Sequence, residues 1–168
     1  MYRLLRPDQI VETLFDIDLD ALARQGVRGI IFDLDNTIVP WDSCEMCPAI
    51  TAWLRGILGR GFKVAIVSNN WRSRVRDIAD RFSLPFVSRA YKPAKTGFRR
   101  ALAVLELEPH EAAVVGDQLF TDVLGGNRLG LTTIWVKPLT SREFIGTRIH
   151  RGFEKLAVRM LRARGLIK

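Results

Sequence analysis

Short apolar runs alternate with amphipathic segments along most of this chain. Runs of four to seven residues at 28–34, 62–67, 112–115 and 131–136 are rich in valine and isoleucine. Such runs are typical of strands that are buried on both faces of a sheet. A shorter run at 85–87 predicts one more strand, so the pattern predicts five strands in all.

Helical signals occupy the segments between these runs. Asp18 is placed to cap a helix that Gly26 ends, and Pro48 opens a second helix that stops before Gly61. Apolar residues at helical spacing indicate three more. The predicted helices span residues 18–25, 48–60, 71–82, 96–107 and 119–129.

The alternation predicts an α/β fold with a doubly wound, mostly parallel, five-stranded sheet. We expect residues 1–136 to form the domain, with 1–27 as a helical lead-in. Residues 137–168 are expected to form a basic helical tail that packs on the domain or extends from it. In folds of this class, ligands bind beyond the carboxyl ends of the strands.

Composition is consistent with one folded domain. The chain has 168 residues, of which 48% are hydrophobic, enough for a substantial core. Charges interrupt every apolar stretch well short of the roughly 20 residues that a membrane span needs. Residues 1–8 lack the apolar stretch of a secretory signal. We therefore expect a cytoplasmic protein, soluble or peripheral at the inner face of the membrane.

Two carboxylates stand where the first long strand ends. Asp33 and Asp35 lie two residues apart, so they leave the strand on the same side. Two like charges held this close are unfavourable unless a cation lies between them or they share a proton. The pair is a candidate for metal-assisted nucleophilic and acid–base chemistry, although acids also serve as ordinary turn residues.

Further polar signatures follow the later strands. Ser68 and Asn69 come after the second strand, Lys92 after the short third, and Asp117 with Asp122 after the fourth. A doubly wound sheet brings these loops to one edge, where carboxylates, a hydroxyl and a lysine suit phosphoryl chemistry. Each residue alone has an ordinary alternative. Ser68 could be a helix cap and Lys92 an exposed loop lysine. Asp117 could be a turn residue and Asp122 a solvated charge on a helix.

The combined motifs resemble a known superfamily. DxDNT, the serine, Lys-Pro and GDxxxxD, in this order and after these strands, resemble the haloacid dehalogenase (HAD) phosphohydrolases over residues 28–136. The strings YKPAKTGFRRAL, GDQLFTDVLGGNRLG and TRIHRGFE resemble the YqeG family of subclass IIIA HAD phosphatases. That family is similar to mitochondrial phosphatidylglycerophosphate phosphatases.

The resemblance implies a role for each motif residue. Asp33 is expected to be the nucleophile that forms an aspartyl-phosphate, and Asp35 the general acid and then the base. Mg2+ is the expected cofactor. Its implied ligands are Asp33, the backbone carbonyl of Asp35, Asp117 and, directly or through water, Asp122.

The remaining motif residues are expected to bind the phosphorylated substrate. Ser68 and the amides around Asn69 are expected to hold phosphate oxygens, while Lys92 neutralises charge. The connections after the strands are too short for the cap domain of larger HAD enzymes, so the resemblance implies an open site suited to bulky substrates. Trp41 and the following segment either form a small flap or pack on the surface.

The two cysteines belong to the segment after Trp41. Cys44 and Cys47 form a lone CxxC pair, and no histidine lies near them in the sequence. A zinc site needs further ligands. The pair therefore favours reduced thiols over metal or redox chemistry.

Positive charge is concentrated in the tail. Residues 137–168 contribute +7 of the formal net charge of +8. Within a predicted helix, one side holds Phe153, Leu156 and Met160, and another holds basic residues. Such a helix suits an anionic membrane or a phosphate backbone, or else its apolar side packs on the domain. The basic residues of the tail are Lys137, Arg142, Arg148, Arg151, Lys155, Arg159, Arg162, Arg164 and Lys168.

Three functional hypotheses follow. The first is a phosphatase acting on a lipid head-group phosphate such as that of phosphatidylglycerophosphate, with peripheral contact to an anionic membrane. The second is a cytosolic phosphatase of small metabolites. The third is a HAD-fold protein that binds RNA or the ribosome. The Asp33/Asp35 pair argues against nucleic-acid binding, because binding alone needs neither carboxylate and both repel a phosphate backbone.

Overall fold

The computed structural model describes the backbone of residues 2–140 and 145–167, and the side chains of residues 3–140 and 152–167. Among the basic residues of the tail, Arg142 and Lys168 lie outside the described residues. The side chains of Arg148 and Arg151 are likewise outside the description.

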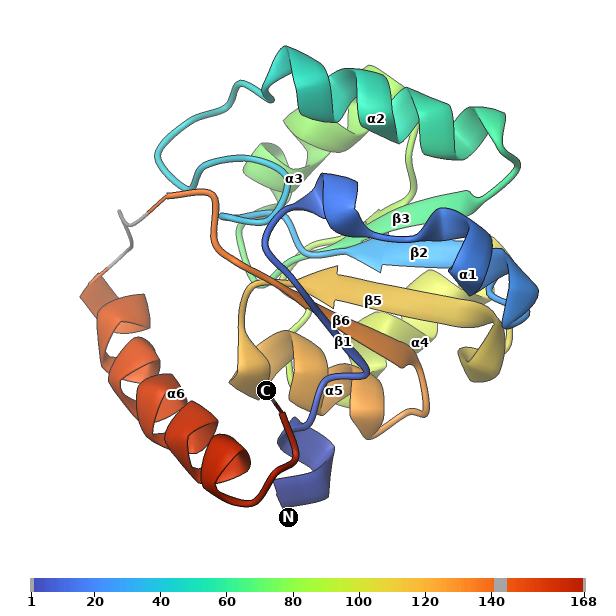
Figure 1. Ribbon diagram of the computed structural model, residues 1–168. Helices are drawn as coiled ribbons and strands as arrows, with labels where there is room; N and C mark the ends of the chain where they lie inside the picture. Colours follow the sequence, from blue (N-terminus) through green and yellow to red (C-terminus); the bar gives the residue numbers. More distant parts are fainter. Residues whose placement is uncertain (1, 141–144, 168) are drawn as a thin grey trace.

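A six-stranded sheet forms the centre of the molecule (Figure 1). The strand order is β1-β6-β5-β2-β3-β4, and every neighbouring pair is parallel. The predicted α/β fold with a doubly wound parallel sheet is therefore confirmed. The strands are β1 (Gln9–Val11), β2 (Gly29–Phe32), β3 (Lys63–Val67), β4 (Phe86–Val87), β5 (Ala112–Gly116) and β6 (Thr132–Val136).

The predicted count of five strands was one too low. β1 lies at the edge of the sheet beside β6, with Gln9 opposite Ile134. It has only three residues, none of them fully buried, which is too short for an apolar alternation to be recognised. Residues 1–27, expected as a helical lead-in, contain this strand together with short helices.

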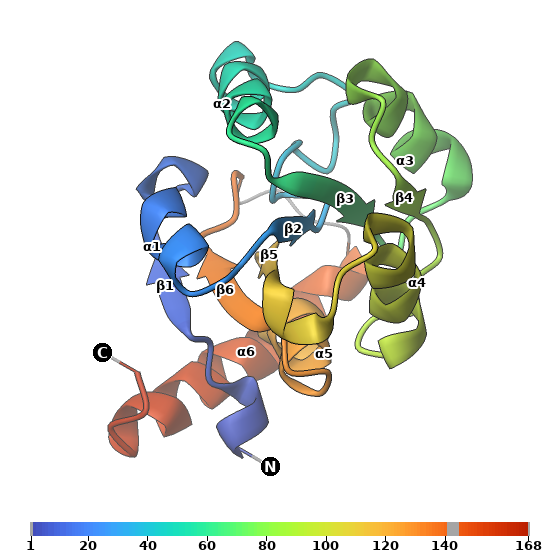
Figure 2. The same ribbon diagram turned by 90° about the vertical axis from the view of Figure 1, so that its right-hand side faces the viewer.

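Helices cover both faces of the sheet (Figure 2). α1, α2 and α3 lie on one face, and α4 and α5 lie on the other. The α-helices are α1 (Leu19–Arg24), α2 (Pro48–Gly59), α3 (Arg72–Ala79), α4 (Lys95–Leu105), α5 (Leu124–Asn127) and α6 (Ile145–Ala163). Short helical turns are η1 (Tyr2–Leu5), η2 (Leu14–Asp16), η3 (Asp80–Phe82) and η4 (Pro109–Glu111), and a π-helix, η5, spans Leu119–Val123.

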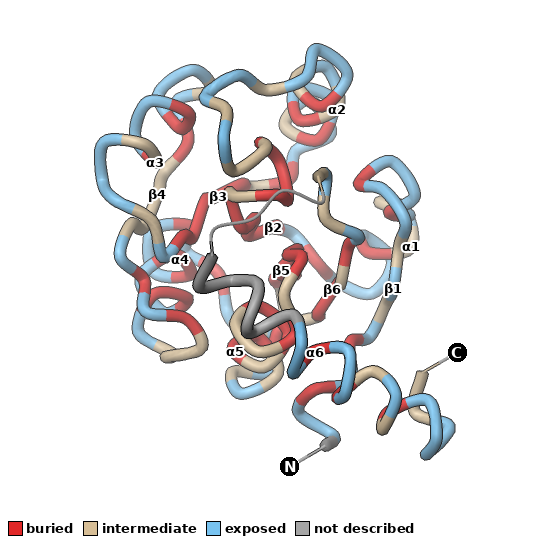
Figure 3. The backbone as a smooth tube through the Cα atoms, turned by 90° about the vertical axis from the view of Figure 1, so that its left-hand side faces the viewer, coloured by how far each residue is buried: buried red, intermediate tan, exposed pale blue. Residues whose placement is uncertain are grey.

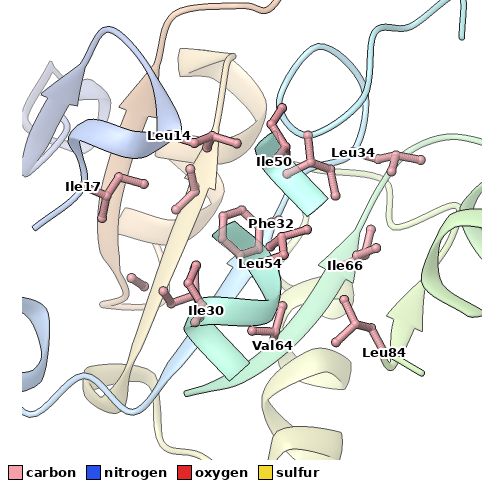
Figure 4. Packing of buried hydrophobic residues seen from close by; sticks show 14 of the residues in the cluster. Leu14, Ile17, Ile30, Phe32, Leu34, Ile50, Leu54, Val64, Ile66 and Leu84 are labelled. Carbon is pink, nitrogen blue, oxygen red and sulfur yellow. The ribbon is translucent and has the colours of Figure 1, made fainter. Parts of the chain in front are cut away.

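The central strand β2 is buried on both faces. Ile30 and Phe32 belong to the buried cluster that also contains Leu54 of α2 (Figure 4). Ile31 belongs instead to the cluster that contains Phe98 of α4. A strand covered on both sides needs apolar residues at every position, which explains the continuous run in the sequence.

The predicted helix at 119–129 divides into two parts. The π-helix η5 comes first and α5 continues from it as a single α-helical turn. Gly125 of α5 stands against the ring of Phe98, and a side chain at this position would collide with that ring. The glycine therefore permits close packing between α5 and α4.

The C-terminal helix α6 runs across the side of the molecule at which the strands end (Figures 1 and 3). Its inward residues Glu154, Ala157 and Leu161 are buried, and the two apolar ones join a third cluster with Leu119 and Val123 of η5. Within the described part of the chain, no helix is both long enough and apolar enough to cross a membrane.

Candidate active site

Parallel pairing brings three strand ends to the same level. The backbone N–H of Asp33 donates to the carbonyl of Val115 at 2.9 Å, which sets Asp33 beside the Gly116–Asp117 turn. Phe32 lies opposite Ile66 of β3, so Ser68 follows at the same edge. The strand order reverses between β2 and β5, because β3 and β4 follow on one side of β2 and β5 and β6 on the other. Such a switch point is the usual ligand-binding position in an open α/β fold.

A buried ion cluster occupies this edge. The Nζ of Lys92 lies 2.6 Å from Oδ1 of Asp33 and 2.6 Å from Oδ1 of Asp122. All three side chains are buried, and Lys92 is only 7% exposed. Charged groups are expensive to bury unless they are paired and hydrogen-bonded, and each of these carboxylates has the ammonium as a partner.

The loop that contains Lys92 is held by its neighbour from β3. The side chain of Asn69 accepts from the backbone N–H of Lys92 at 2.7 Å and donates to the carbonyl of Lys92 at 3.2 Å. The hydroxyl of buried Ser68 accepts from the N–H of Asn70 at 3.1 Å. The Asn69 side chain thus orients Lys92. It also joins the loop of Lys92 to the loop after β3, which contains Ser68.

The carboxylates fit a divalent cation. Asp33, Asp117 and Asp122 are all buried, and one oxygen of each lies within 4.8 Å of the others. When all three are ionised, Lys92 balances one charge and leaves two, which matches one divalent ion. Oxygen-only donors suit Mg2+ or Ca2+ rather than softer metals.

Gly116 makes room for this cluster. A Cβ atom at Gly116 would overlap the carboxylate of Asp122, so only glycine lets Asp122 approach the end of β5. The other oxygen of Asp122 accepts from the N–H of Gln118 at 3.2 Å. The glycine of the GDxxxxD string is therefore explained by close approach of a side chain.

Asp35 lies outside the cluster and has different partners. Its Oδ1 accepts from Nε of Arg74 at 2.8 Å, and its Oδ2 accepts from Nδ2 of Asn70 at 3.0 Å. Arg74 also donates to the carbonyl of Pro40 at 3.0 Å and contacts the sulfur of Cys44 at 3.6 Å. Arg74 was missed by the sequence analysis, because one arginine on an amphipathic helix looks like any other polar position.

Arg74 joins the segment after β2 to the site. The segment from Trp41 to Cys47, expected either as a small flap or as surface packing, is linked to Asp35 through Arg74. The backbone N–H of Trp41 donates to the side chain of Asn36 at 3.3 Å. Cys44 and Cys47 are exposed and no disulfide links them. The connections at 33–47 and 88–94 contain no inserted domain.

Burial and charge perturb the two central groups. Burial raises the pKa of Asp33 to about 7, although Lys92 acts in the opposite direction and the neighbouring Asp122 and Asp35 add to the rise. For Lys92, burial opposes the charge, but the carboxylates of Asp122 and Asp33 outweigh it and raise its pKa above the ordinary value. Each charge in the cluster depends on the others.

Solved structures with the same architecture place the chain in the HAD class. A HAD phosphatase from Thermococcus onnurineus matches with 26% identity and a TM-score of 0.51, over 60% of this chain and 51% of that one. The cobalt-bound deoxy-D-mannose-octulosonate 8-phosphate phosphatase YrbI from Haemophilus influenzae matches with 12% identity and a TM-score of 0.55. That match covers 84% of this chain and 91% of the other, and it supports the fold alone.

Sequence relatives define the family. The probable phosphatase YqeG of Bacillus subtilis is 41% identical over 96% of this chain and 94% of its own length. The chain belongs to the YqeG family of HAD-type phosphatases, as its motifs predicted. A HAD-hydrolase-like family model matches residues 90–142. Phosphatidylglycerophosphate phosphatase 1 of Arabidopsis thaliana is 29% identical over 93% of this chain, which spans only 48% of that relative.

The raised pKa of Asp33 predicts a pH-dependent stability. Its pKa of about 7 in the folded protein exceeds the ordinary value of about 3.9 in an unfolded chain, so folding favours the protonated form. The contribution of Asp33 is complete below its unfolded pKa and is lost as pH rises through about 7. The free energy of unfolding without metal should therefore fall between about pH 4 and about pH 7, and Asp33→Asn should reduce this fall.

Urea unfolding in EDTA at several pH values measures this effect as the difference between wild type and variant. Asp77→Asn, which changes an exposed carboxylate on α3, serves as the control. A pH dependence that is the same in wild type and Asp33→Asn would contradict the assignment of the effect to Asp33.

Proposed function

We propose that this HAD-type phosphatase hydrolyses phosphate monoesters with Mg2+ through an aspartyl-phosphate on Asp33. The buried cluster of Asp33, Lys92 and Asp122, with Asp117 beside it, is the observation that most supports this function. Asp33, Asp117 and Asp122 would hold the cation together with the backbone of Asp35. A bound Mg2+ would neutralise carboxylate and phosphate charge, which favours attack by an anion on an anion.

The proposed reaction has two steps, formation and hydrolysis of the aspartyl-phosphate. A carboxylate oxygen of Asp33 bonds to phosphorus while the bond to the leaving oxygen breaks, and Asp35 donates a proton to that oxygen. Asp35 then accepts a proton from water, whose oxygen attacks phosphorus and releases Asp33. Lys92 keeps a positive charge beside the nucleophile throughout, while Ser68 and the amides near Asn69 bind phosphate oxygens.

A lipid head group is the substrate that we favour. The connections beside the site contain no inserted domain, so a phosphate on a bulky molecule can approach the strand ends. Relatives from Arabidopsis thaliana and Chlamydomonas reinhardtii are phosphatidylglycerophosphate phosphatases, each 29% identical to this chain. Phosphatidylglycerophosphate, whose terminal phosphate is a monoester, is therefore the first substrate to test.

The outer surface of α6 supports contact with an anionic membrane. Phe153 is 61% exposed and Leu156 is 54% exposed, so these two apolar side chains are open to solvent. Lys155 and Arg159 are exposed next to it. A helix that shows apolar and basic residues together on its open side suits the surface of an anionic bilayer.

The proposed nucleophile and substrate can be tested together. Asp33→Asn should lower phosphate release by at least roughly 1,000-fold, because an amide cannot form the covalent intermediate. Phosphate release is measured from phosphatidylglycerophosphate in anionic vesicles, from glycerol 3-phosphate and from p-nitrophenyl phosphate, with and without Mg2+. Undiminished activity in the variant or in EDTA would refute the mechanism. Turnover of the soluble esters alone would instead favour a phosphatase of small metabolites.

Arg74 should act through Asp35. Arg74→Gln releases the Asp35 carboxylate, so kcat/KM for an alkyl phosphate should fall by roughly 100-fold, the lower end of the usual range for general acid catalysis. The value for p-nitrophenyl phosphate should change by less than about 5-fold, since its leaving group departs without a proton. Arg76→Gln, on the exposed side of the same helix, is the control. An equal loss for both esters would mean that Arg74 does not act through the acid.

Vesicle binding tests the outer surface of α6. Each basic residue near an anionic surface contributes about 1 kcal/mol, so Lys155→Glu with Arg159→Glu should weaken binding to phosphatidylglycerol vesicles by at least roughly 10-fold. Arg99→Glu with Arg100→Glu on α4 makes the same change in net charge at another exposed place. Co-sedimentation should separate the two pairs. Equal binding by both double variants would remove α6 from the proposal.

A further inference from the structure

The C-terminal helix contributes one buried acid to the loop of the candidate cation site. Glu154 of α6 is only 4% exposed although it belongs to a basic helix on the surface. Its Oε1 accepts a hydrogen bond of 2.6 Å from the backbone N–H of Leu119. The two residues are 35 positions apart in the chain, so this contact exists only because α6 folds back against η5.

The amide that Glu154 binds opens the π-helix η5. The first N–H groups of a helix have no partner within the helix and need an acceptor from elsewhere. Gln118, at the N-cap position, provides no side-chain cap. The N–H of Gln118 is bound instead by Asp122, and the N–H of Leu119 by Glu154. Glu154 therefore acts as the cap of η5 from another part of the chain.

The capped segment contains two of the three clustered carboxylates. Asp117 lies two residues before Leu119, and Asp122 lies within η5. The indole N–H of Trp135 donates to the carbonyl of Asp117 at 2.9 Å, which holds the start of the segment. Glu154 holds its middle. At 2.6 Å, this hydrogen bond is a direct polar contact between α6 and η5.

The surrounding packing makes the contact specific. Ala157 and Leu161 follow Glu154 on the same side of α6 and join the apolar cluster with the side chains of Leu119 and Val123. These small and aliphatic residues bring the two helices together but offer η5 no hydrogen-bond acceptor. The carboxylate of Glu154 provides that acceptor.

We propose that Glu154 is a positioning residue for the cation site, so that the C-terminal helix forms part of the active site. It sets the position of η5 and thereby the distance from Asp122 to Asp117 and Asp33. This inference rests on the proposed function in one respect, namely that these three aspartates bind Mg2+. It adds a residue from α6 to a site that the motifs assign only to residues 33–122.

Calorimetric titration of Mg2+ into the protein tests this directly, without any substrate. Glu154→Met keeps the length and packing of the side chain but removes the acceptor, and it should raise the dissociation constant for Mg2+ by roughly 10-fold, as loss of outer-shell contacts does at other metal sites. Glu154→Gln retains an oxygen that can accept from Leu119 and should stay within about 3-fold of wild type. The two variants differ mainly in that acceptor.

A stability-matched control separates positioning from general weakening of the fold. Leu22→Ala removes a fully buried side chain from α1, which belongs to a different apolar cluster from α6 and η5. It should lower the melting temperature while leaving the Mg2+ dissociation constant within about 2-fold. If Glu154→Met does not fold, Glu154→Asp replaces it, because the shorter carboxylate cannot reach the amide without movement of α6.

The outcomes distinguish this inference from the proposed function. Weak Mg2+ binding in Glu154→Met with near-normal binding in Glu154→Gln and Leu22→Ala supports the positioning role. Equal affinity in Glu154→Met and wild type, or an equal loss in Leu22→Ala, overturns it while the proposed function stands. Wild-type affinity in Asp117→Asn would refute the cation site itself and, with it, both proposals.

Discussion

The buried contact between Lys92, Asp33 and Asp122 is the constraint on which the rest of the site depends. One ammonium lies 2.6 Å from an oxygen of each carboxylate, and all three groups are away from water. Such an arrangement is unfavourable unless each charge keeps its partners, so the loops that contain these residues must be held accurately. Asn69 fixes the backbone of Lys92, Gly116 leaves space for Asp122, and Glu154 holds the amide of Leu119. Burial raises the pKa of Asp33, and the neighbouring carboxylates of Asp122 and Asp35 add to the rise. The excess negative charge of the cluster fits a divalent cation.

The sheet explains why such a demanding cluster can form. Parallel strands end at one edge, and the register of β2 with β5 and β3 brings Asp33, Asp117 and Ser68 to that edge. The apolar residues of β2 are packed on both faces, so the strand that positions Asp33 is fixed by the core of the whole molecule (Figure 4). The charges that the proposed function needs are therefore buried, and their burial reduces the stability of the fold.

Different segments of the chain border the two sides of the site. Toward α3, Arg74 links Asp35 with the segment that contains Pro40 and Cys44. Toward α5, the C-terminal helix lies against η5 and exposes apolar and basic side chains outward. The strand ends therefore lie between the segment that contains Pro40 and Cys44 and the C-terminal helix α6. No inserted domain separates the site from a large substrate in the connections at 33–47 and 88–94.

The sequence by itself determined the fold class and the proximity of Asp33, Asp117 and Lys92, because buried strands are recognisable and parallel strands must end together. Its motifs indicated the family through their resemblance to known phosphatases. It did not reveal β1, whose three residues are too few to show a period. Only the tertiary structure identified Arg74 and Glu154, whose contacts join residues 39 and 35 positions apart. It also decided which side of the C-terminal helix is buried. The pattern left open whether the side with Phe153 and Leu156 packs on the domain, and in the structure these two residues are exposed. Glu154, Ala157 and Leu161 are buried instead. Periodicity shows that a helix has different sides, but the neighbouring surface decides which side is buried, and here η5 provides a backbone amide for which an acid is the better partner.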